Sequence, residues 1–255
     1  MENLNKRIAI ITGVSHSRGI GAAICRRLAQ EGVDIFFTYW NADTNWDLHF
    51  KKELKNYNIR CHSIEADLSD PTSVNVIFDQ VASQLGIPTI LVNNAAVSTQ
   101  DGYLNLNAKT LDNHYAVNVR AACLLSVEFA RRFKEAQLVR GSIINMTSGQ
   151  AQGPMPCELA YAASKGAISA FTLSLSAELA PLGIAVNALN PGPTDTGWMT
   201  PEIKQALTPK FLSGRVGEPE DAANIVAFLT SEEAKWITGQ VINAKRGRRI
   251  SKRLV

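Results

Sequence analysis

Ser148, Tyr161 and Lys165 lie close together in the sequence, and their side chains are of the types that carry out proton transfer. Tyr161 and Lys165 are four positions apart, so on a helix they project from the same face. A helix that begins near Glu158 therefore places a phenol hydroxyl beside an ammonium group. A loop that leaves the preceding apolar run, residues 141–147, brings the Ser148 hydroxyl to the same point. The three groups predict a site in which hydroxyls hold a carbonyl oxygen and a phenol gives or takes its proton.

Seven short apolar runs alternate with helical segments along the chain, and these elements have to position the three side chains. The runs predicted to be strands are Arg7–Thr12, Val33–Tyr39, Arg60–Ala66, Thr89–Asn93, Gly141–Thr147, Ile184–Leu189 and Gln240–Ala244. The segments predicted to be helices are Gly19–Glu31, Trp46–Asn56, Pro71–Leu85, Thr110–Lys134, Leu159–Ala180 and Pro219–Ser231. Several runs are almost continuously apolar, which is typical of parallel strands buried on both faces. The alternation predicts an α/β fold: a single-domain, Rossmann-type, doubly wound parallel sheet flanked by helices.

The composition is that of an ordinary globular protein, with 255 residues of which 45% are hydrophobic and 19% charged. No break in composition and no internal repeat divides the chain, so we expect one domain over residues 1–255. The N-terminus lacks a signal-peptide pattern and the apolar runs are too short to span a bilayer, so we expect no membrane partner. Four cysteines without a CxxC pair are expected to be free thiols in the reducing cytoplasm, with no metal site; they are Cys25, Cys61, Cys123 and Cys157.

The positive charge is concentrated in the last eleven residues, 245–255, which contain six Lys or Arg residues and no acid. The overall net charge is +3, so removing these six cations leaves −3 for residues 1–244. A basic tail can touch nucleic acid or a membrane, but the rest of the chain shows no basic stretch that would extend such a surface. We therefore predict no nucleic-acid partner.

A glycine-rich turn, TGVSHSRGIGAAI, follows the first predicted strand and opens the first predicted helix. Gly13 can form the turn, Gly19 can let the backbone approach a ligand, and Gly21 can allow the helix to pack close to the strand. A turn of this kind directs backbone N–H groups at a pyrophosphate. The sequence therefore predicts a dinucleotide site; the alternative is a turn that is merely rich in glycine.

The choice of dinucleotide depends on the end of the second strand, where an acid usually binds the ribose 2′-hydroxyl of NAD. Here FFTYWN is followed by no acid before Asp43, which we expect to cap the next helix. Arg18, just before Gly19, offers a guanidinium that can bind a 2′-phosphate through two hydrogen bonds. NADP(H) is therefore favoured over NAD(H).

The region Pro191–Glu218 is rich in proline and glycine and carries Trp198 and Met199 in its middle. It is too long for a simple connection, and it follows a strand at the edge where doubly wound sheets bind their ligands. We therefore expect residues 193–218 to form a substrate lid with short helices. The alternative is a surface excursion without a role.

Eight motifs occur in the order found in the short-chain dehydrogenase/reductase family, and the chain resembles that family over about residues 6–244. The motifs are TGVSHSRGIG at 12–21, ADL at 66–68, NNAA at 93–96, HYAVN at 114–118, INMTS at 144–148, YAASK at 161–165, PGPTDT at 191–196 and GRVGEPEDAA at 214–223. Within the family the chain is most similar to the bacterial 3-oxoacyl-(acyl-carrier-protein) reductase-like group. The resemblance implies an NAD(P)-dependent oxidoreductase that acts on CH–OH or C=O groups.

The resemblance also implies roles for single residues. The positions that match the catalytic tetrad are Asn118, Ser148, Tyr161 and Lys165. The positions that match the cofactor site are Gly13, Ser15, Arg18, Gly19, Ile20, Gly21, Thr38, Asp67, Leu68, Asn94, Ala95, Tyr161, Lys165, Pro191, Gly192, Thr194 and Thr196. Among them Asp67 matches the residue that binds the adenine amino group, and Asn93 and Ala95 match the adenosine side. Taken alone, Asn118 could as well cap or kink a helix, and Asp67 could open the turn that follows it.

Carbonyl reduction by such a tetrad divides the chemistry among the side chains. Hydride goes to a carbonyl carbon whose oxygen is held by the hydroxyls of Ser148 and Tyr161, and Tyr161 protonates the developing alkoxide. Lys165 also holds the nicotinamide ribose, and Asn118 anchors a water relay to solvent. A free tyrosine titrates near pH ~10, so a value near ~7 needs roughly 4 kcal/mol. We expect the Lys165 ammonium and the charge of oxidised nicotinamide to lower the pKa of Tyr161.

One departure from the family pattern lies in the glycine turn. Five residues, Val14–Arg18, separate the first two glycines where the family usually has three. The longer loop resembles that of divergent enoyl reductases of the same superfamily, whose tyrosine and lysine are seven positions apart. The spacing of four between Tyr161 and Lys165 therefore favours a carbonyl over an enoyl substrate. His16 and Ser17 in the insert either add contacts near the adenine ribose or only fill the turn.

A second departure is the C-terminus, where Lys245, Arg246 and Gly247 replace the usual Asp-Gly-Gly turn. Family members are commonly homo-oligomers, so we expect a tetramer or dimer, whose contact the basic tail could weaken. The helix 159–180 has an apolar stripe and a face of small residues, each compatible with packing inside one subunit or against a partner. The stripe is Ile168, Phe171, Leu175 and Leu179, and the small face is Ala163, Gly166, Ala170 and Ser174.

The predicted substrate pocket is apolar with one amide, and its residues are Gln150, Met155, Trp198 and Met199. It is compatible with 3-oxoacyl thioesters, other ketones, quinones or steroids. The leading hypothesis is NADP(H)-dependent reduction of a carbonyl to a secondary alcohol, with tyrosine as the proton donor. The alternatives are oxidation of a secondary alcohol, an enoyl reductase-like enzyme, and a non-catalytic NADP(H)-binding regulator.

Overall fold

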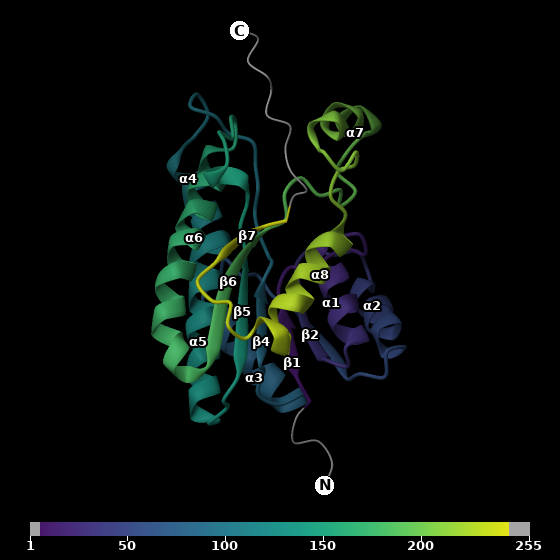
Figure 1. The fold of residues 1–255 in the computed structure, drawn as a ribbon, viewed down its shortest axis with the longest axis vertical. Helices are drawn as coiled ribbons and strands as arrows, with labels where there is room; N and C mark the ends of the chain where they lie inside the picture. The colour runs from purple at the N-terminus through teal and green to yellow at the C-terminus, as the bar shows by residue number, and fades with distance from the viewer. Residues whose placement is uncertain (1–5, 245–255) are drawn as a thin grey trace.

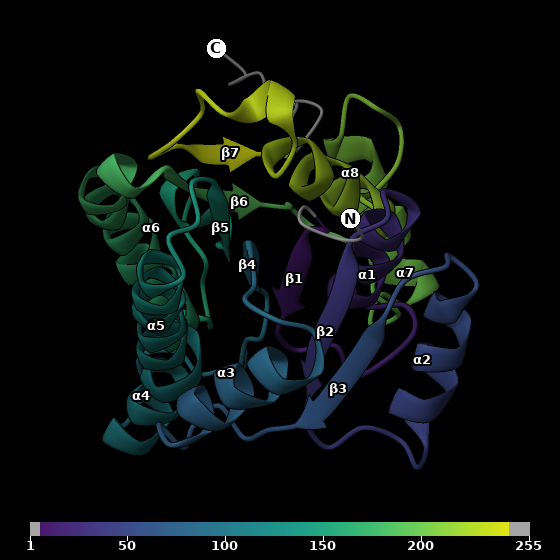
Figure 2. The same ribbon diagram turned by 90° about the horizontal axis from the view of Figure 1, so that it is seen from below.

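The protein is described by a computed structural model over residues 6–244. Its strands form one seven-stranded sheet in the order β3-β2-β1-β4-β5-β6-β7, in which every neighbouring pair is parallel. Helices cover both faces of the sheet (Figures 1 and 2). The chain begins at a central strand, builds one half of the sheet outward, and returns to build the other half. The predicted Rossmann-type α/β fold is confirmed.

The strands lie within one or two residues of the predicted ranges. They are β1 (Ile8–Ile11), β2 (Asp34–Tyr39), β3 (Cys61–Glu65), β4 (Ile90–Asn93), β5 (Gly141–Met146), β6 (Ile184–Asn190) and β7 (Val241–Asn243). All residues of β1, β4 and β5 are buried, because these strands are central and covered on both faces. Their apolar composition follows from that double burial.

Two layers of helices enclose two hydrophobic cores. One layer is α1 (Ile20–Gln30), α2 (Trp46–Lys55) and α8 (Pro219–Leu229), and the other is α3 (Ser73–Gln84), α5 (Ala122–Glu135) and α6 (Leu159–Leu179) (Figure 2). Short 3-10 turns connect several elements: η2 (Gly149–Ala151), η3 (Ala180–Leu182), η4 (Thr208–Lys210) and η5 (Glu232–Ala234). Residues 147–158 lead from the end of β5 to α6, whose first turns lie at the carboxyl edge of the sheet (Figure 1).

Two details differ from the sequence-based expectations. The predicted helix 110–134 is divided into α4 (Ala108–His114), a π-helical segment η1 (Tyr115–Ala121) and α5, and such wide turns are frequent at functional sites. Asp43 does not cap α2 with its side chain: the residue before the helix is Asn45, and Asp43 contributes only its backbone carbonyl, which accepts from Trp46 N–H at 2.9 Å.

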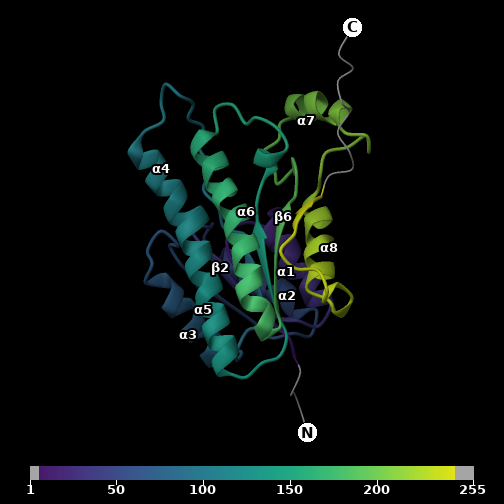
Figure 3. The same cartoon turned by 60° about the vertical axis from the view of Figure 1, so that its left-hand side comes forward.

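Residues 193–218, the predicted lid, rise above the carboxyl edge of the sheet and carry α7 (Pro201–Leu207) (Figures 1 and 3). The two ends of the lid are joined by a parallel bridge between Thr194 and Gly217. Asp195 pairs with Lys204 and accepts from Gly197 N–H at 2.9 Å, so the lid has internal structure of its own. Within residues 6–244, no helix has the length and apolar character needed to cross a membrane.

Candidate active site

Tyr161 and Lys165 lie on successive turns at the start of α6, as their spacing predicts. The Nζ atom of Lys165 lies 5.6 Å from the centre of the Tyr161 ring. Ser148 lies two residues after the end of β5 and directly precedes η2, which places its hydroxyl close enough to Tyr161 to affect the pKa of the phenol. The structure therefore brings the three side chains together, although they come from two elements.

The pKa of Tyr161 is raised above its ordinary value, mainly because burial disfavours the phenolate. The Ser148 hydrogen bond acts in the opposite direction and lowers it, while the negative charge of Glu158 raises it further. The side chains around Tyr161 therefore do not produce the expected lowering of its pKa. The phenol keeps its proton at neutral pH, which is the state required of a proton donor.

Lys165 is only 2% exposed, and its ammonium donates to the carbonyl oxygen of Met146 at 2.8 Å. Burial lowers the pKa of Lys165 to about 8, because a charge away from water is disfavoured. The ammonium form still predominates at pH ~7. Its bond to the end of β5 holds the cation close to the phenol.

Asn118 lies in the π-helical segment and is 2% exposed. Its Oδ1 accepts from Val97 N–H at 2.7 Å, and its Nδ2 donates to the Val97 carbonyl at 2.8 Å and to Ser164 Oγ at 3.0 Å. Both amide N–H groups are therefore used by the protein. The remaining lone pair of Oδ1 is the acceptor that the side chain still offers to the predicted water relay.

The glycine turn between β1 and α1 is packed tightly against the loop that follows β4. Gly13 has φ +72°, and a Cβ there would lie 2.5 Å from Ala95 Cα. A Cβ on Gly21 would lie 2.7 Å from Asn94 Nδ2, which itself donates to the carbonyls of Thr12 and Gly13 at 2.8 and 3.1 Å. These positions have no room for a side chain, and Asn94 holds the turn in place.

A cavity of about 440 Å³ lies in front of the N-terminus of α1. The residue before the helix, Gly19, provides no side-chain cap, and the first turn contains no acid. Backbone N–H groups at such a helix end suit a phosphate. The residues around the cavity are Gly13, Ser15, His16, Gly19, Ile20, Gly21, Thr38, Tyr39, Trp40, Ala66, Asp67, Leu68, Asn94, Ala95, Ala96, Val97, Val117 and Thr196. They include most of the residues predicted to bind a dinucleotide, and the chain fits that group.

Comparison with known proteins agrees with this geometry. A family model described as enoyl-(acyl carrier protein) reductase matches residues 13–248. An uncharacterized oxidoreductase of Bacillus subtilis (strain 168), YjdA, is 58% identical over 247 residues, covering 97% of this chain and 98% of the relative. The 3-oxoacyl-[acyl-carrier-protein] reductase FabG of Aquifex aeolicus (strain VF5) is 32% identical, covering 96% of this chain and 98% of the relative. The chain belongs to the short-chain dehydrogenase/reductase family.

A solved structure of the same fold supports the assignment. The blue fluorescent protein from a metagenomic library, in complex with NADPH, superposes with a TM-score of 0.85 at 33% identity, covering 96% of this chain and 99% of that one. As a short-chain dehydrogenase/reductase, the chain is an NAD(P)-dependent oxidoreductase acting on carbonyl or alcohol groups. The matching residues of 3-oxoacyl reductase relatives extend over almost the whole chain.

Six residues expected at the cofactor do not line this cavity: Tyr161 and Lys165 of the tetrad, and Arg18, Pro191, Gly192 and Thr194. A Cβ on Gly197 would be 2.6 Å from Nη2 of Arg18, so the Arg18 guanidinium rests on the lid. Pro191 lines a different cavity, Gly192 N–H donates to Asn190 Oδ1 at 3.0 Å, and Thr194 takes part in the bridge at the base of the lid. The prediction that Arg18 binds a 2′-phosphate stays a prediction, and it requires the guanidinium to leave Gly197.

The insert that distinguishes this short-chain dehydrogenase/reductase is fixed by surrounding side chains. Trp46 Nε1 donates to the Val14 carbonyl at 2.7 Å, and Ser15 Oγ exchanges hydrogen bonds with the backbone of Trp40 at 3.1 Å. His16 lines the cavity, whereas Ser17 contributes its carbonyl to Arg26. Trp40 was not predicted at the site; its position directly after β2 is the signal that could have indicated it.

Asn93 does not line the adenosine side, contrary to the expectation. Its Nδ2 donates to Asn145 Oδ1 at 2.8 Å and to Ser126 Oγ at 2.9 Å, which ties β4 to β5 and α5. The reason is register, because alternate residues of a strand point to opposite faces.

Asp67 is compatible with both of its predicted roles, in the cofactor site and at the start of the turn that follows it. It borders the cavity, and its carboxylate also accepts from Ser69 N–H at 2.8 Å.

Neither the cavity in front of α1 nor the cavity that Pro191 borders is lined by any of the predicted substrate residues, Gln150, Met155, Trp198 and Met199. Gln150 Nε2 donates to Ser169 Oγ at 3.0 Å and to Thr147 Oγ1 at 3.2 Å, so its amide points at the protein. Met199 is buried in the lid, whereas Trp198 is 57% exposed and donates to the Thr194 carbonyl. Gln150 as the amide of the substrate pocket stays a prediction: hydroxyls engage its Nε2, while its buried Oε1 has no hydrogen-bond partner among the described residues.

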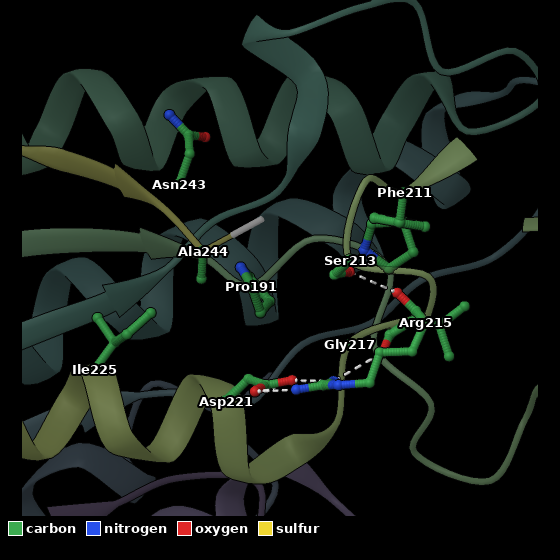
Figure 4. Close-up of a pocket in the computed structure, with 11 residues that line it drawn as sticks. Pro191, Phe211, Ser213, Arg215, Gly217, Asp221, Ile225, Asn243 and Ala244 are labelled. Carbon is green, nitrogen blue, oxygen red and sulfur yellow. Dashed lines mark hydrogen bonds and ion pairs between the residues drawn. The ribbon is translucent and has the colours of Figure 1, made fainter. Parts of the chain in front are cut away.

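A second cavity, of about 380 Å³, lies between the lid, the end of β7 and α8. Figure 4 shows Arg215 side by side with Asp221, and the two form paired hydrogen bonds of 2.7 Å. No residue of the glycine turn borders this cavity, so we do not place the dinucleotide there. Among the residues that the structure describes, no group of His, Cys, Asp and Glu side chains could hold a metal ion.

Proposed function

We propose that the chain is an NADP(H)-dependent reductase that converts a ketone, such as a 3-oxoacyl thioester, into a secondary alcohol. The observation that carries the proposal is the grouping of Tyr161, Ser148 and Lys165, with the Lys165 Nζ atom 5.6 Å from the centre of the Tyr161 ring. A screen that follows NADPH oxidation, with 3-oxoacyl thioesters first and other ketones next, tests it. The relative FabG is itself a 3-oxoacyl-[acyl-carrier-protein] reductase, which supports this order of substrates.

The mechanism assigns a role to each of the four side chains. When bound, the dinucleotide supplies a hydride to the carbonyl carbon. Ser148 and Tyr161 hold the carbonyl oxygen, and the Tyr161 proton passes to that oxygen as negative charge develops on it. The resulting phenolate is stabilised by the buried Lys165 ammonium, whose charge is strong where water is excluded. Asn118 holds Val97 and Ser164 in place and leaves one oxygen lone pair for a water.

The preference for NADP(H) is supported by the end of β2. Tyr39 and Trp40 border the cavity there, and Asn41 follows, so no carboxylate of this segment would repel a 2′-phosphate. Arg18 lies immediately before Gly19 on the glycine turn. The NADPH complex of the blue fluorescent protein has the same fold.

Arg18→Ala is expected to raise the KM for NADPH about tenfold to a hundredfold and to leave the KM for NADH unchanged, because one charge-assisted hydrogen bond contributes about 1.5–3 kcal/mol. Steady-state kinetics with both cofactors measures the ratio. Arg27→Ala is the matched control, since Arg27 lies on the helix that follows the turn but pairs with Glu31 and Asn224. An unchanged NADPH-to-NADH ratio in Arg18→Ala would show that another group reads the phosphate.

A second candidate is an enoyl reductase, which the description of the matching family model favours. Against it stands the arrangement on α6, where Tyr161 and Lys165 share one face with a single turn between them. Incubation with a 2-enoyl thioester and NADPH separates the two: we expect no saturated product. Formation of the saturated thioester at a rate above that of ketone reduction would favour the enoyl assignment.

We also propose that the chain forms a homo-oligomer in a reducing compartment such as the cytoplasm, where its free cysteines are stable. The apolar stripe of α6 packs inside the subunit, because Ile168, Leu175 and Leu179 are buried. The face of small residues is left exposed, together with Leu173 at 64%. An exposed apolar face of this kind suits a partner subunit.

The basic residues 245–255 lie outside the described part of the chain, and their effect on assembly can be tested directly. A chain that ends at Ala244 is expected to show a larger oligomer fraction than the full-length chain at low salt, because six unbalanced cations repel one another. Light scattering at low and high salt measures the mass. The same mass and thermal stability for both chains at low salt would dismiss the effect of the tail.

A further inference from the structure

Helix α6 begins without a cap from its own preceding residue. That residue is Glu158, and its side chain makes no capping hydrogen bond. The first N–H groups of a helix have no partner within the helix and must find one elsewhere. Tyr161 lies in this first turn, so the group that holds the helix end also holds the phenol.

The partner is Asp101, in the loop between β4 and α4, 58 residues before Leu159. Asp101 Oδ1 accepts from Leu159 N–H at 2.8 Å, and Oδ2 accepts from Ala160 N–H at 2.8 Å. The N–H of Asp101 donates to the Cys157 carbonyl at 2.8 Å, and the residue is 8% exposed. Hydrogen bonds from Ala160 N–H first, and then from Leu159 and Gly102, lower the pKa of this carboxyl. An anion therefore sits at the positive end of the helix.

The loop between β4 and α4 also contacts the segment that carries His114 and Asn118, through Val97 and Thr99. Val97 exchanges two hydrogen bonds with the amide of Asn118. Thr99 N–H donates to Nε2 of the buried His114 at 3.3 Å. Asp101 then reaches α6, beside which α4 lies (Figures 1 and 3). One loop therefore joins Asn118, the cofactor cavity through Val97, and the helix that carries Tyr161.

A carboxylate suits this position better than its amide. Two oxygens receive two helix N–H groups, whereas asparagine has one acceptor oxygen and would direct an NH₂ group at the second N–H. The chain caps another helix in the local way: Asn107 Oδ1 accepts from Thr110 N–H at 3.0 Å at the start of α4. The catalytic helix is instead held by a residue from a remote loop, so its place depends on that loop.

We infer that Asp101 is a positioning residue for carbonyl reduction, whose carboxylate places the first turn of α6 and thereby the Tyr161 hydroxyl relative to Ser148. The inference rests on the proposed role of Tyr161. Asp101 does not border the cofactor cavity, so it acts through the helix. A shift of the phenol by even ~1 Å can lower a rate about a hundredfold.

Asp101→Asn is therefore expected to lower kcat by about tenfold to a hundredfold and to change the KM for NADPH by less than about twofold, since the cavity keeps its lining. The experiment compares steady-state kinetics on a ketone that the wild type reduces, NADPH binding by fluorescence, and the melting temperature. Asn107→Ala is the matched control, because it removes the cap of α4 without touching α6. It is expected to lower the melting temperature and keep the wild-type kcat.

Asp101→Glu keeps the charge and both acceptor oxygens and serves if Asp101→Asn does not fold. The kcat of Asp101→Glu is expected to lie between those of the wild type and of Asp101→Asn. If Asp101→Asn is unfolded, the expectation for Asp101→Glu is a kcat below that of the wild type with an unchanged KM for NADPH. A wild-type kcat in Asp101→Asn and Asp101→Glu, or an equal loss in Asn107→Ala at the same melting temperature, overturns the inference. An inactive Tyr161→Phe together with a fully active Asp101→Asn removes this inference alone and leaves the proposed function in place.

Discussion

Tyr161→Phe is expected to lower kcat for NADPH-dependent ketone reduction by about 10³-fold, within the range of 10²–10⁴ that general acid catalysis contributes. The ring and its packing are kept, and only the hydroxyl that gives the proton and holds the carbonyl oxygen is removed. The raised pKa of Tyr161 means that this hydroxyl is protonated in the chain at neutral pH.

NADPH binding and melting temperature provide the internal controls for this variant. The melting temperature should stay at the wild-type value and NADPH binding should change far less than kcat, because Tyr161 does not line the cavity in front of α1. Tyr115→Phe is a matched control, since Tyr115 lies on the exposed side of the π-helical segment. Activity of Tyr161→Phe close to that of the wild type would mean that Tyr161 is not the proton donor.

Lys165→Met is expected to lower kcat by about 10²-fold or more, because the phenolate formed in the reaction loses the cation beside it. The pH dependence of the wild-type kcat/KM tests the same role of Lys165. The kcat/KM for NADPH should fall above about pH 8, where the buried ammonium loses its proton. Rates measured from pH 6 to 10 provide the profile, and Lys165→Met should show no such fall.

The free energy of unfolding should change with pH in the opposite direction to kcat/KM: it should rise as the pH rises. The pKa of Lys165 in the folded chain is about 8, below the value of ~10.4 of a free lysine. Between these two values the unfolded chain binds more protons, so the contribution of Lys165 to the free energy of unfolding rises with pH. Below pH 8 the buried charge costs stability, and Lys165→Met should be at least as stable as the wild type in urea unfolding. A large loss of stability in Lys165→Met, or a flat wild-type profile, would contradict this account.

The strands and the spacing on α6 were predictable because they depend on short-range patterns. The apolar runs of β1, β4 and β5 reflect burial on both faces. The four-residue spacing of Tyr161 and Lys165 places both on one helical face without any tertiary information. The glycine turn could be placed because Gly13 has a positive φ that few other residues adopt.

The remaining features depend on contacts between distant parts of the chain. Asp101 reaches α6 from a loop 58 residues away, and no local pattern marks an acid as the cap of another element. Arg18 rests on Gly197 of the lid, and Gln150 donates to Ser169 on α6. In each case the side chain has several possible partners, and the three-dimensional packing decides which one it contacts. The π-helical turn at Asn118 was likewise missed, because a helical pattern does not distinguish wide turns from α-helix.

The central claim is that the chain transfers hydride from NADPH to a ketone with Tyr161 as the proton donor. Incubation with NADPH deuterated at the reactive carbon, followed by mass spectrometry of the product, tests it most directly. With 3-oxoacyl thioesters, other ketones, quinones and steroids as candidates, at least one alcohol should carry deuterium on its carbinol carbon, and Tyr161→Phe should abolish it. Binding of NADPH without any deuterated alcohol, or deuterium in a saturated thioester formed from an enoyl substrate, would contradict the claim.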